Sequence, residues 1–237
     1  MERTEQLWPG GPRYRYDEHC FPPSTDSFLL GGFAAPRRGQ RVCDLGAGAG
    51  LLGLLLLGHE PTVTVTGIER DAHACDMLRR NAVENALPMT ALCADLRQRD
   101  ALPNGAFQLA VSNPPYFPPH TGAVATGTRG EARAQLTAAL PDVFAAAARL
   151  LQWGGRFCLV YRPEQLPALM TAAVEHGLAP KRLRMVQHTA QSAPSLVLLE
   201  CRRGGKPHLS VESPLLLRLA DGSESPDVRR AYFRDKE

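Results

Sequence analysis

Short apolar runs alternate with amphipathic helical patterns along the chain from about residue 40 onward. Seven runs have the length and the β-branched content of strands, namely residues 41–44, 62–69, 90–94, 107–112, 156–161, 183–187 and 195–201. Four helices are predicted between them, over residues 50–57, 71–85, 141–151 and 163–176. Strands that alternate with helices form βαβ units. The pattern therefore predicts an α/β fold with a doubly wound, mostly parallel seven-stranded sheet of the Rossmann-like kind.

Two segments interrupt this alternation. Residues 117–135 are rich in Pro, Gly and Thr and predict a long loop directly after the fourth strand, of the length that is usually functional or disordered. The tail from residue 202 contains a short apolar run at 215–219, which predicts a hairpin followed by a charged end. We divide the chain into an N-terminal cap or substrate segment (1–40), the α/β domain (41–201) and a basic C-terminal extension of that domain (202–237).

The composition is that of a globular protein, with 44% hydrophobic and 22% charged residues among 237. The most apolar stretch, residues 45–58, is shorter than the roughly 20 residues that cross a bilayer. The N-terminus carries charges of both signs and no apolar signal segment. The six cysteines are scattered without a CxxC pair. We expect a cytoplasmic monomer with no membrane contact, no disulfide and no metal site.

Basic residues are concentrated toward the C-terminus. The chain has a net charge of +3, and residues 178–237 contain 11 basic and 7 acidic side chains, a net of +4. Such a bias is typical of a solvated surface and also of a protein that binds a polyanion. Charge alone leaves both interpretations open.

A glycine-rich turn follows the first predicted strand, where D-L-G-A-G-A-G occupies residues 44–50. Small residues there let backbone approach a bound adenosine derivative, at the edge where doubly wound sheets bind ligands. Residues 48–53 satisfy GxGxxG with Glu69 about 20 residues on, so a nicotinamide dehydrogenase is one interpretation. Its last two glycines would then fall within the helix. The frame from Asp44, with Gly46, Gly48 and Gly50 in the turn, favours S-adenosylmethionine (SAM).

Acidic residues end the first three predicted strands, and each suits one part of SAM. Asp44 can accept a hydrogen bond from the methionine ammonium and Glu69 from the ribose hydroxyls. Asp95 can accept from the adenine amine, with Leu96 packed on the ring. A tight turn without ligand is the alternative for the glycines, and a loop or cap role is the alternative for Asp95.

The most specific feature is N-P-P-Y at residues 113–116, directly after the fourth predicted strand. Two prolines form a rigid turn that presents carbonyl groups and the Asn113 side chain outward. The Asn113 amide oxygen and the Pro114 carbonyl can bind both N–H groups of an amine and direct its lone pair at the SAM methyl group. Tyr116 can stack on a planar substrate. The motif, Pro115 included, predicts N-methylation, with a strand-ending turn as the alternative.

Together these motifs resemble class I SAM-dependent N-methyltransferases, and in particular the bacterial tRNA1(Val) adenine-37 N6-methyltransferase family. The resemblance spans about residues 13–201 and implies SAM as cofactor, residues 113–116 as the catalytic group and an adenine of structured RNA as substrate. The matching positions are T-D-S-F-L-L at 25–30, D-L-G-A-G-A-G at 44–50, Glu69, Asp95, S-N-P-P-Y-F at 112–117, and Arg129, Ala132 and Arg133.

Other proteins with this motif remain as alternatives. Release-factor glutamine methyltransferases carry a helical domain before the catalytic one, and only about 40 residues precede Asp44 here. DNA adenine methyltransferases need a target-recognition domain, for which the segment after Cys201 is short. RNA is therefore favoured, with the base displaced into the pocket. The residues expected to contact it are Arg129, Arg133 and the basic C-terminal region, namely Lys181, Arg182, Arg184, Arg202, Arg203 and Lys206. A SAM- or RNA-binding module without catalysis is a further alternative.

Overall fold

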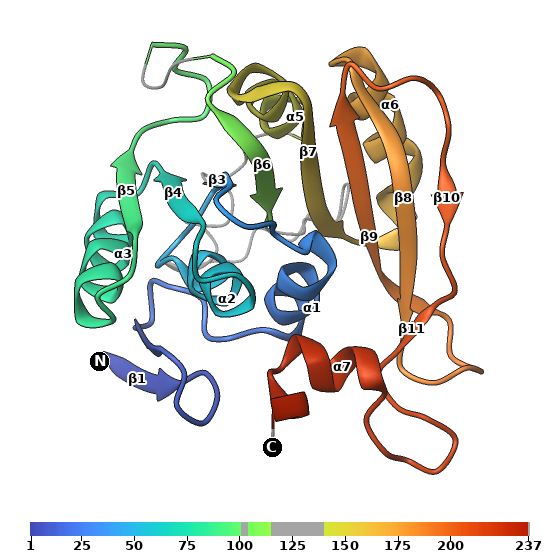
Figure 1. Ribbon diagram of the computed structural model, residues 1–237, viewed down its shortest axis with the longest axis horizontal. Helices are drawn as coiled ribbons and strands as arrows, with labels where there is room; N and C mark the ends of the chain where they lie inside the picture. Colours follow the sequence, from blue (N-terminus) through green and yellow to red (C-terminus); the bar gives the residue numbers. More distant parts are fainter. Residues whose placement is uncertain (101–103, 115–139, 237) are drawn as a thin grey trace, which may run out of the picture.

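One twisted sheet forms the centre of the protein (Figure 1). The computed structural model describes residues 1–100, 104–114 and 140–236. Within these, the sheet has nine strands in the order β10-β8-β9-β7-β6-β3-β4-β5, with β11 also paired to β8. The strands are β3 (Arg41–Leu45), β4 (Thr64–Glu69), β5 (Met89–Cys93), β6 (Phe107–Ser112), β7 (Leu151–Tyr161), β8 (Leu178–Gln187), β9 (Pro194–Arg203), β10 (Ser210–Val211) and β11 (Leu215–Leu216). Neighbouring strands are parallel except that β9 runs antiparallel to β7 and β8.

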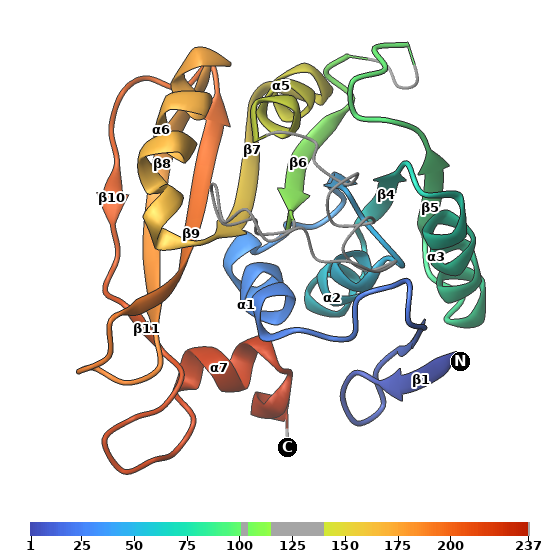
Figure 2. The ribbon, with the colours of Figure 1, turned by 180° about the vertical axis from the view of Figure 1, so that it is seen from behind.

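Helices cover both faces of this sheet. They are α1 (Thr25–Ala34), α2 (Leu51–His59), α3 (Ala72–Glu84), α5 (Leu140–Leu150), α6 (Leu166–Glu175) and α7 (Pro226–Ala231), with 3-10 turns at Pro163–Gln165 and Arg234–Lys236. Successive strand residues point to opposite faces, so Val42 packs with α1, α2 and α3 while Cys43 packs with α5 and α6. Helix α6 lies in front of β8 and β9 in Figure 2 and behind them in Figure 1. No helix within the described residues is long and apolar enough to cross a bilayer.

The order of the strands creates a switch point between β3 and β6. From β3 the chain adds β4 and β5 on one side, and β6 and β7 then lie on the other side of β3. Ligands of doubly wound sheets bind outside the carboxyl ends of the strands at such a point. The ends of β3, β4, β5 and β6 carry or precede Asp44, Glu69, Asp95 and Asn113. The fold therefore places the predicted site residues along one edge.

All seven predicted strands and four predicted helices are present, but the predicted boundary before β7 is wrong. The sequence predicts a helix over residues 141–151 and a strand from residue 156, yet α5 ends at Leu150 and β7 begins at Leu151. Gly154 has a φ of +77° inside the strand, where the register against β6 shifts. Glycine here accommodates an irregularity in the ladder rather than a loop.

The C-terminal prediction of a hairpin is also wrong. Strands β10 and β11 each pair in parallel with β8, and neither pairs with the other. Leu215 of β11 is buried in the core that α1 and α2 share. The apolar run thus adds to the edge of the main sheet, because burial against that core outweighs a local turn, and α7 follows it.

Three N-terminal elements were not predicted: the antiparallel hairpin of β1 (Arg3–Gln6) and β2 (Arg13–Tyr16), and helix α1. The α1 N-cap is Ser24, whose hydroxyl accepts from the backbone N–H of Ser27. Ser24 followed by Asp26 in the first turn is a recognisable helix start. Tyr14 and Phe28 from this segment lie in the same apolar cluster as Leu54.

Candidate functional site

The glycine-rich turn joins β3 to α2 and presents open backbone at the switch point. Gly46, Gly48 and Gly50 have φ values of +74°, +54° and +88°, which a side chain rarely adopts. A Cβ atom at Gly46 or Gly48 would meet nothing within 4 Å, whereas at Gly50 it would lie 2.8 Å from Cγ of Leu78. The first two glycines therefore border open space suited to a ligand, and the third allows α3 to pack closely.

The GxGxxG frame at residues 48–53 and the frame that starts at Asp44 differ by fewer helical glycines than the sequence predicts. Gly50 is the N-cap residue of α2 and precedes the helix, so only Gly53 of the GxGxxG frame falls within it. A Cβ atom at Gly53 would lie 2.6 Å from Sδ of Met89. Gly53 thus allows α2 to pack closely on β5, and it is the one glycine of the GxGxxG frame that lies within the helix, where two were predicted.

Glu69 at the end of β4 is bound to the turn. Its carboxylate is buried and accepts hydrogen bonds from the backbone N–H groups of Gly48 (2.9 Å), Arg70 (2.8 Å) and Asp71 (2.9 Å). Backbone donors to a carboxylate give strong, charge-assisted bonds. Glu69 therefore has a fixed position beside Gly48.

Asp44 is a buried carboxylate beside this turn. It is 2% exposed, and its Oδ2 atom has no hydrogen-bond partner within the part of the chain that the structure describes. Burial, and then the negative charge of Glu69, raises the pKa of Asp44 to about 7. A buried carboxylate is costly without a partner, so this atom suits a ligand that brings a positive charge or a hydrogen-bond donor.

Asp95 follows β5 and has a partner of its own. Its Oδ1 accepts from the backbone and Nε of Arg97 (both 2.9 Å), and its Oδ2 accepts from Nη2 of Arg97 (2.6 Å). These bonds lower the pKa of Asp95 to about 2. A ligand amine at this carboxylate would share it with Arg97.

Asn113, at the end of β6, contacts the start of helix α1. Its Nδ2 donates to the Ser27 hydroxyl at 3.0 Å, and the Ser24 hydroxyl donates to the same Ser27 oxygen at 3.2 Å. The preceding Ser112 donates to the Leu45 carbonyl at 2.8 Å and so ties β6 to β3. Ser27 is buried and was not predicted as a site residue. The signal that could have located it is the helix start Ser-Thr-Asp-Ser at residues 24–27.

Pro114 is described and buried, while four other predicted site residues lie outside the described residues. These are Pro115, Tyr116, Arg129 and Arg133. The structure thus brings Asp44, the three glycines, Glu69 and Asn113 to one edge, with Asp95 two residues beyond the end of β5.

One group of metal-ligating side chains comes together at the start of α3. Ligand atoms of Asp17, Cys20 and His73 lie within 4.8 Å of one another. Asp17 Oδ2 and His73 Nε2 are 2.7 Å apart and form an ion pair when His73 is protonated. This pair accounts for their proximity without a metal ion.

The sheet order and the position of the glycine-rich turn define a class I SAM-dependent methyltransferase fold. A predicted O-methyltransferase from Agrobacterium tumefaciens superimposes with a TM-score of 0.72 at 23% identity, covering 88% of this chain and 97% of that one. A 16S rRNA N2 methyltransferase of T. thermophilus in complex with AdoMet and guanosine matches with a TM-score of 0.57 at 25% identity, over 86% of this chain and 50% of that one.

The chain belongs to the methyltransferase small domain family, whose model matches residues 24–177. Two relatives carry the name tRNA1(Val) (adenine(37)-N6)-methyltransferase. The protein from Cronobacter sakazakii is 35% identical over 78% of this chain and 76% of its own length. The protein from Serratia proteamaculans is 31% identical over 91% of this chain and 83% of its own length.

Proposed function

We propose that the protein transfers a methyl group from SAM to the exocyclic N6 amine of an adenine in tRNA. The position of Asn113 is the observation that carries this proposal. Strand β6 pairs with β3 so that Val111 lies beside Asp44, and Asn113 follows two residues later. An amide group thus stands next to the proposed cofactor edge, in a chain whose relatives are named tRNA adenine-N6 methyltransferases.

The side chains at this edge fit SAM. Asp44 would accept from the methionine ammonium, which gives its unpaired buried oxygen a cationic partner. Glu69 would accept from the ribose hydroxyls, and Asp95 from the adenine amine. Gly46 and Gly48 leave room for the ligand against the backbone. Bound SAM supplies an electrophilic methyl group on its sulfonium.

The chain's own groups would orient the acceptor amine. Because Nδ2 of Asn113 donates to Ser27, the amide oxygen is directed to the other side, where it can accept one N–H of the amine. The Pro114 carbonyl would accept the other. The nitrogen lone pair would then face the methyl group that SAM supplies, and the amine would release its proton to solvent after the transfer. Tyr116 would stack on the base.

The raised pKa of Asp44 predicts that cofactor binding depends on pH. Near pH 6 the free protein holds Asp44 mostly protonated, since burial and Glu69 raise its pKa to about 7. An ammonium group favours the ionised carboxylate, so binding must release this proton. Affinity for S-adenosylhomocysteine (SAH), which retains the ammonium, should fall roughly tenfold per pH unit below 7.

Calorimetry from about pH 5.5 to about pH 7.5 measures this dependence, and buffers of different ionisation enthalpy count the protons released. Asp44→Asn should remove it and bind weakly throughout. Constant wild-type affinity across this range would exclude the assigned role of Asp44.

Several basic residues first considered for RNA contact make bonds within the protein. Arg182 binds Glu200 at 3.0 Å and the Phe33 carbonyl at 2.6 Å. Arg184 binds Asp227 at 2.6 Å, and Arg203 donates to the Leu151 carbonyl. These three arginines are therefore not proposed to contact RNA.

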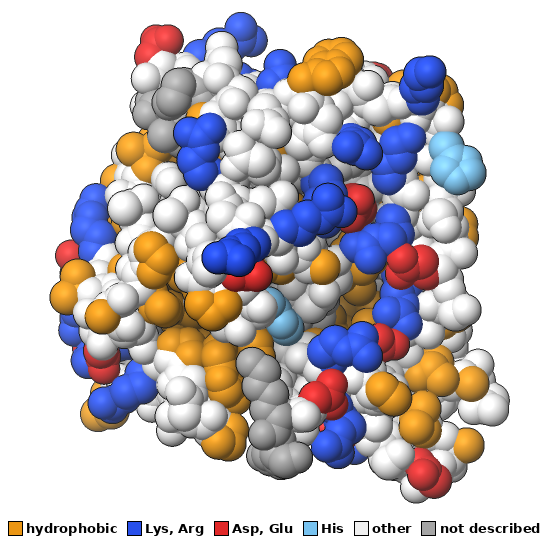
Figure 3. Space-filling view, viewed as in Figure 1, with side chains coloured by type: hydrophobic (Ala, Val, Ile, Leu, Met, Phe, Trp, Pro, Cys, Tyr) orange, Lys and Arg blue, Asp and Glu red, His pale blue; other side chains and the backbone are white. Residues whose placement is uncertain are grey.

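Five other basic side chains define a basic surface, namely Arg37, Arg38, Lys181, Arg202 and Lys206. All are exposed except Lys181, which is half-buried and donates to the Lys206 carbonyl. Nε of Arg202 donates to the Gly154 carbonyl at 3.0 Å, but its side chain stays exposed, unlike those of Arg182, Arg184 and Arg203. Arg202 pairs with Arg156 across strands β9 and β7. Arg156 in turn donates to the carbonyl of Ala35, two residues before Arg37, so this part of the sheet lies next to the segment with Arg37 and Arg38. Lys and Arg side chains are frequent across the middle and upper right of Figure 3. Phosphate groups of tRNA suit such a surface.

Removing two charges from this surface should weaken binding to all tRNAs alike. We expect Arg202→Ala with Lys206→Ala to lower the slope of log affinity against log salt by about two, because phosphate contacts release counterions. Arg229→Ala with Arg230→Ala is the control, since both arginines pair with acidic residues near the C-terminus. Filter binding at several salt concentrations measures both slopes. Equal slopes in the wild type and the first variant would rule out this surface.

Labelled SAM tests the acceptor class. We expect label to enter unmodified tRNA, at a rate that falls as salt rises, and not a release factor bearing its acceptor glutamine. Label in the release factor without salt dependence would instead favour the glutamine N5-methyltransferase.

A further inference from the structure

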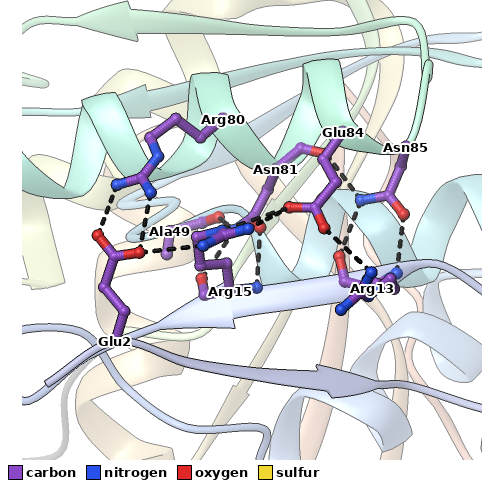
Figure 4. A network of polar contacts seen from close by, with 8 residues as sticks. All are labelled: Glu2, Arg13, Arg15, Ala49, Arg80, Asn81, Glu84 and Asn85. Carbon is purple, nitrogen blue, oxygen red and sulfur yellow. Dashed lines mark hydrogen bonds and ion pairs between the residues drawn. The ribbon is translucent and has the colours of Figure 1, made fainter.

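Two asparagines of α3 hold the N-terminal hairpin in the same way (Figure 4). Asn81 accepts from the Arg15 N–H at 2.8 Å and donates to the Arg15 carbonyl at 2.9 Å. Asn85 accepts from the Arg13 N–H at 2.7 Å and donates to the Arg13 carbonyl at 2.8 Å. Asn81 and Asn85 are four residues apart, a rise of about 6 Å along a helix. Arg13 and Arg15 are two residues apart, about 6.6 Å along a strand, so the two spacings match. Each side-chain amide thus pairs with one residue of β2.

Asn81 differs from Asn85 in one contact. Its Nδ2 also donates to the carbonyl of Ala49, at 2.8 Å, within the glycine-rich turn. The second bond of Asn85 instead goes to the Asn81 carbonyl in its own helix. Asn81 is fully buried and Ala49 is 2% exposed, so water cannot replace this bond.

The glycine-rich turn is consequently held at two neighbouring residues. Glu69 accepts from the Gly48 N–H on one side, and Asn81 donates to the Ala49 carbonyl on the other. Glycine backbone has more conformations to lose than any other, so a turn with three glycines needs such bonds to stay in one conformation before a ligand binds.

The ion pairs of the hairpin with α3 lie at its surface, while Tyr14 and Tyr16 of β2 are buried in the apolar cluster that α3 shares. Glu2 pairs with Arg80 and Arg15, and Arg15 pairs with Glu84, all at partly exposed side chains. Such pairs contribute little stability individually. Among the described residues, Asn81 is therefore the buried side chain that hydrogen-bonds both the hairpin and the turn.

We propose that Asn81 is a positioning residue for the cofactor: its amide couples docking of the N-terminal hairpin to the conformation of the glycine-rich turn. This inference rests on the proposed binding of SAM at that turn. Coupling between two sites is reciprocal, so bound cofactor also stabilises the docked hairpin.

Asn85→Ala is the matched control for Asn81→Ala, because both remove an amide pair with β2 and only the latter removes the bond to the turn. Calorimetric titration with SAH, well below the melting temperatures of both variants, should show a loss of about tenfold or more in Asn81→Ala. Asn85→Ala should stay within about twofold of the wild type, although it too loses stability. Equal losses in both variants, or none in Asn81→Ala, would overturn the inference.

Amide hydrogen exchange of the wild-type protein decides the question if Asn81→Ala fails to fold. SAH should slow exchange of the Arg15 amide, which Asn81 holds, more than that of the Arg13 amide, which Asn85 holds. An Arg15 amide that does not respond to SAH would refute the coupling. Wild-type protein that does not bind SAH would refute the proposed function itself, whereas an error in the RNA acceptor would leave both experiments unchanged.

Discussion

Asn113→Ala is expected to lose on the order of 10² to 10³ in turnover while SAH affinity stays within a few fold. Asn113 would accept a hydrogen bond that strengthens as positive charge develops on the attacking nitrogen. Removing one such preorganised partner raises the barrier of the chemical step. The cofactor contacts assigned to Asp44 and Glu69 do not pass through Asn113 and should persist. Single-turnover rates with saturating tRNA and labelled SAM measure the loss.

Ser27→Ala is the informative companion variant. It removes the hydroxyl that accepts from Nδ2 of Asn113 at 3.0 Å but leaves the amide oxygen in place. We expect a smaller loss of turnover than in Asn113→Ala, with Ser27→Thr recovering part of it. Near-normal turnover in Asn113→Ala would exclude the assigned role and with it the proposed chemistry.

Glu69→Ala should weaken SAH binding by roughly ten- to a hundredfold, because hydrogen bonds to a charged acceptor contribute about 1.5–3 kcal/mol. The substitution removes the proposed acceptor of the ribose hydroxyls. It also releases the Gly48 N–H and so loosens the turn. Calorimetry with SAH measures the effect in the absence of RNA.

Asp95→Ala provides the comparison for Glu69→Ala. Both oxygens of Asp95 already accept from Arg97, so the ligand amine would gain less there. We expect Asp95→Ala to lose less than about tenfold in affinity. A larger loss in Asp95→Ala than in Glu69→Ala would contradict the assignment of the ribose to Glu69.

The parts of the site that could be predicted are those with local signals. The glycine-rich turn follows a short apolar strand directly, and Asn113 follows another, so residue order alone indicated their place at strand ends. The parallel βαβ pattern then implied that these ends share one edge. That edge contains Asp44, Glu69 and Asn113 in the structure.

What could not be predicted depends on contacts between distant segments. Arg182 was expected to face RNA, but Glu200 on the neighbouring strand β9 and the Phe33 carbonyl at the end of α1 bind it. The C-terminal apolar run joins β8 because the edge of that strand is open to it. The spacing of Asn81 and Asn85 places both on one face of a helix. The sequence around them does not indicate that Asn81 binds Arg15 and Ala49, which are far away along the chain.

The most direct test of the proposed function is mass spectrometry of nucleosides from tRNA of a strain that lacks this gene, treated with the purified protein and SAM. The proposed function predicts N6-methyladenosine after treatment with the wild-type protein and none after treatment with Asn113→Ala. Absence of N6-methyladenosine after treatment with the wild-type protein would contradict it.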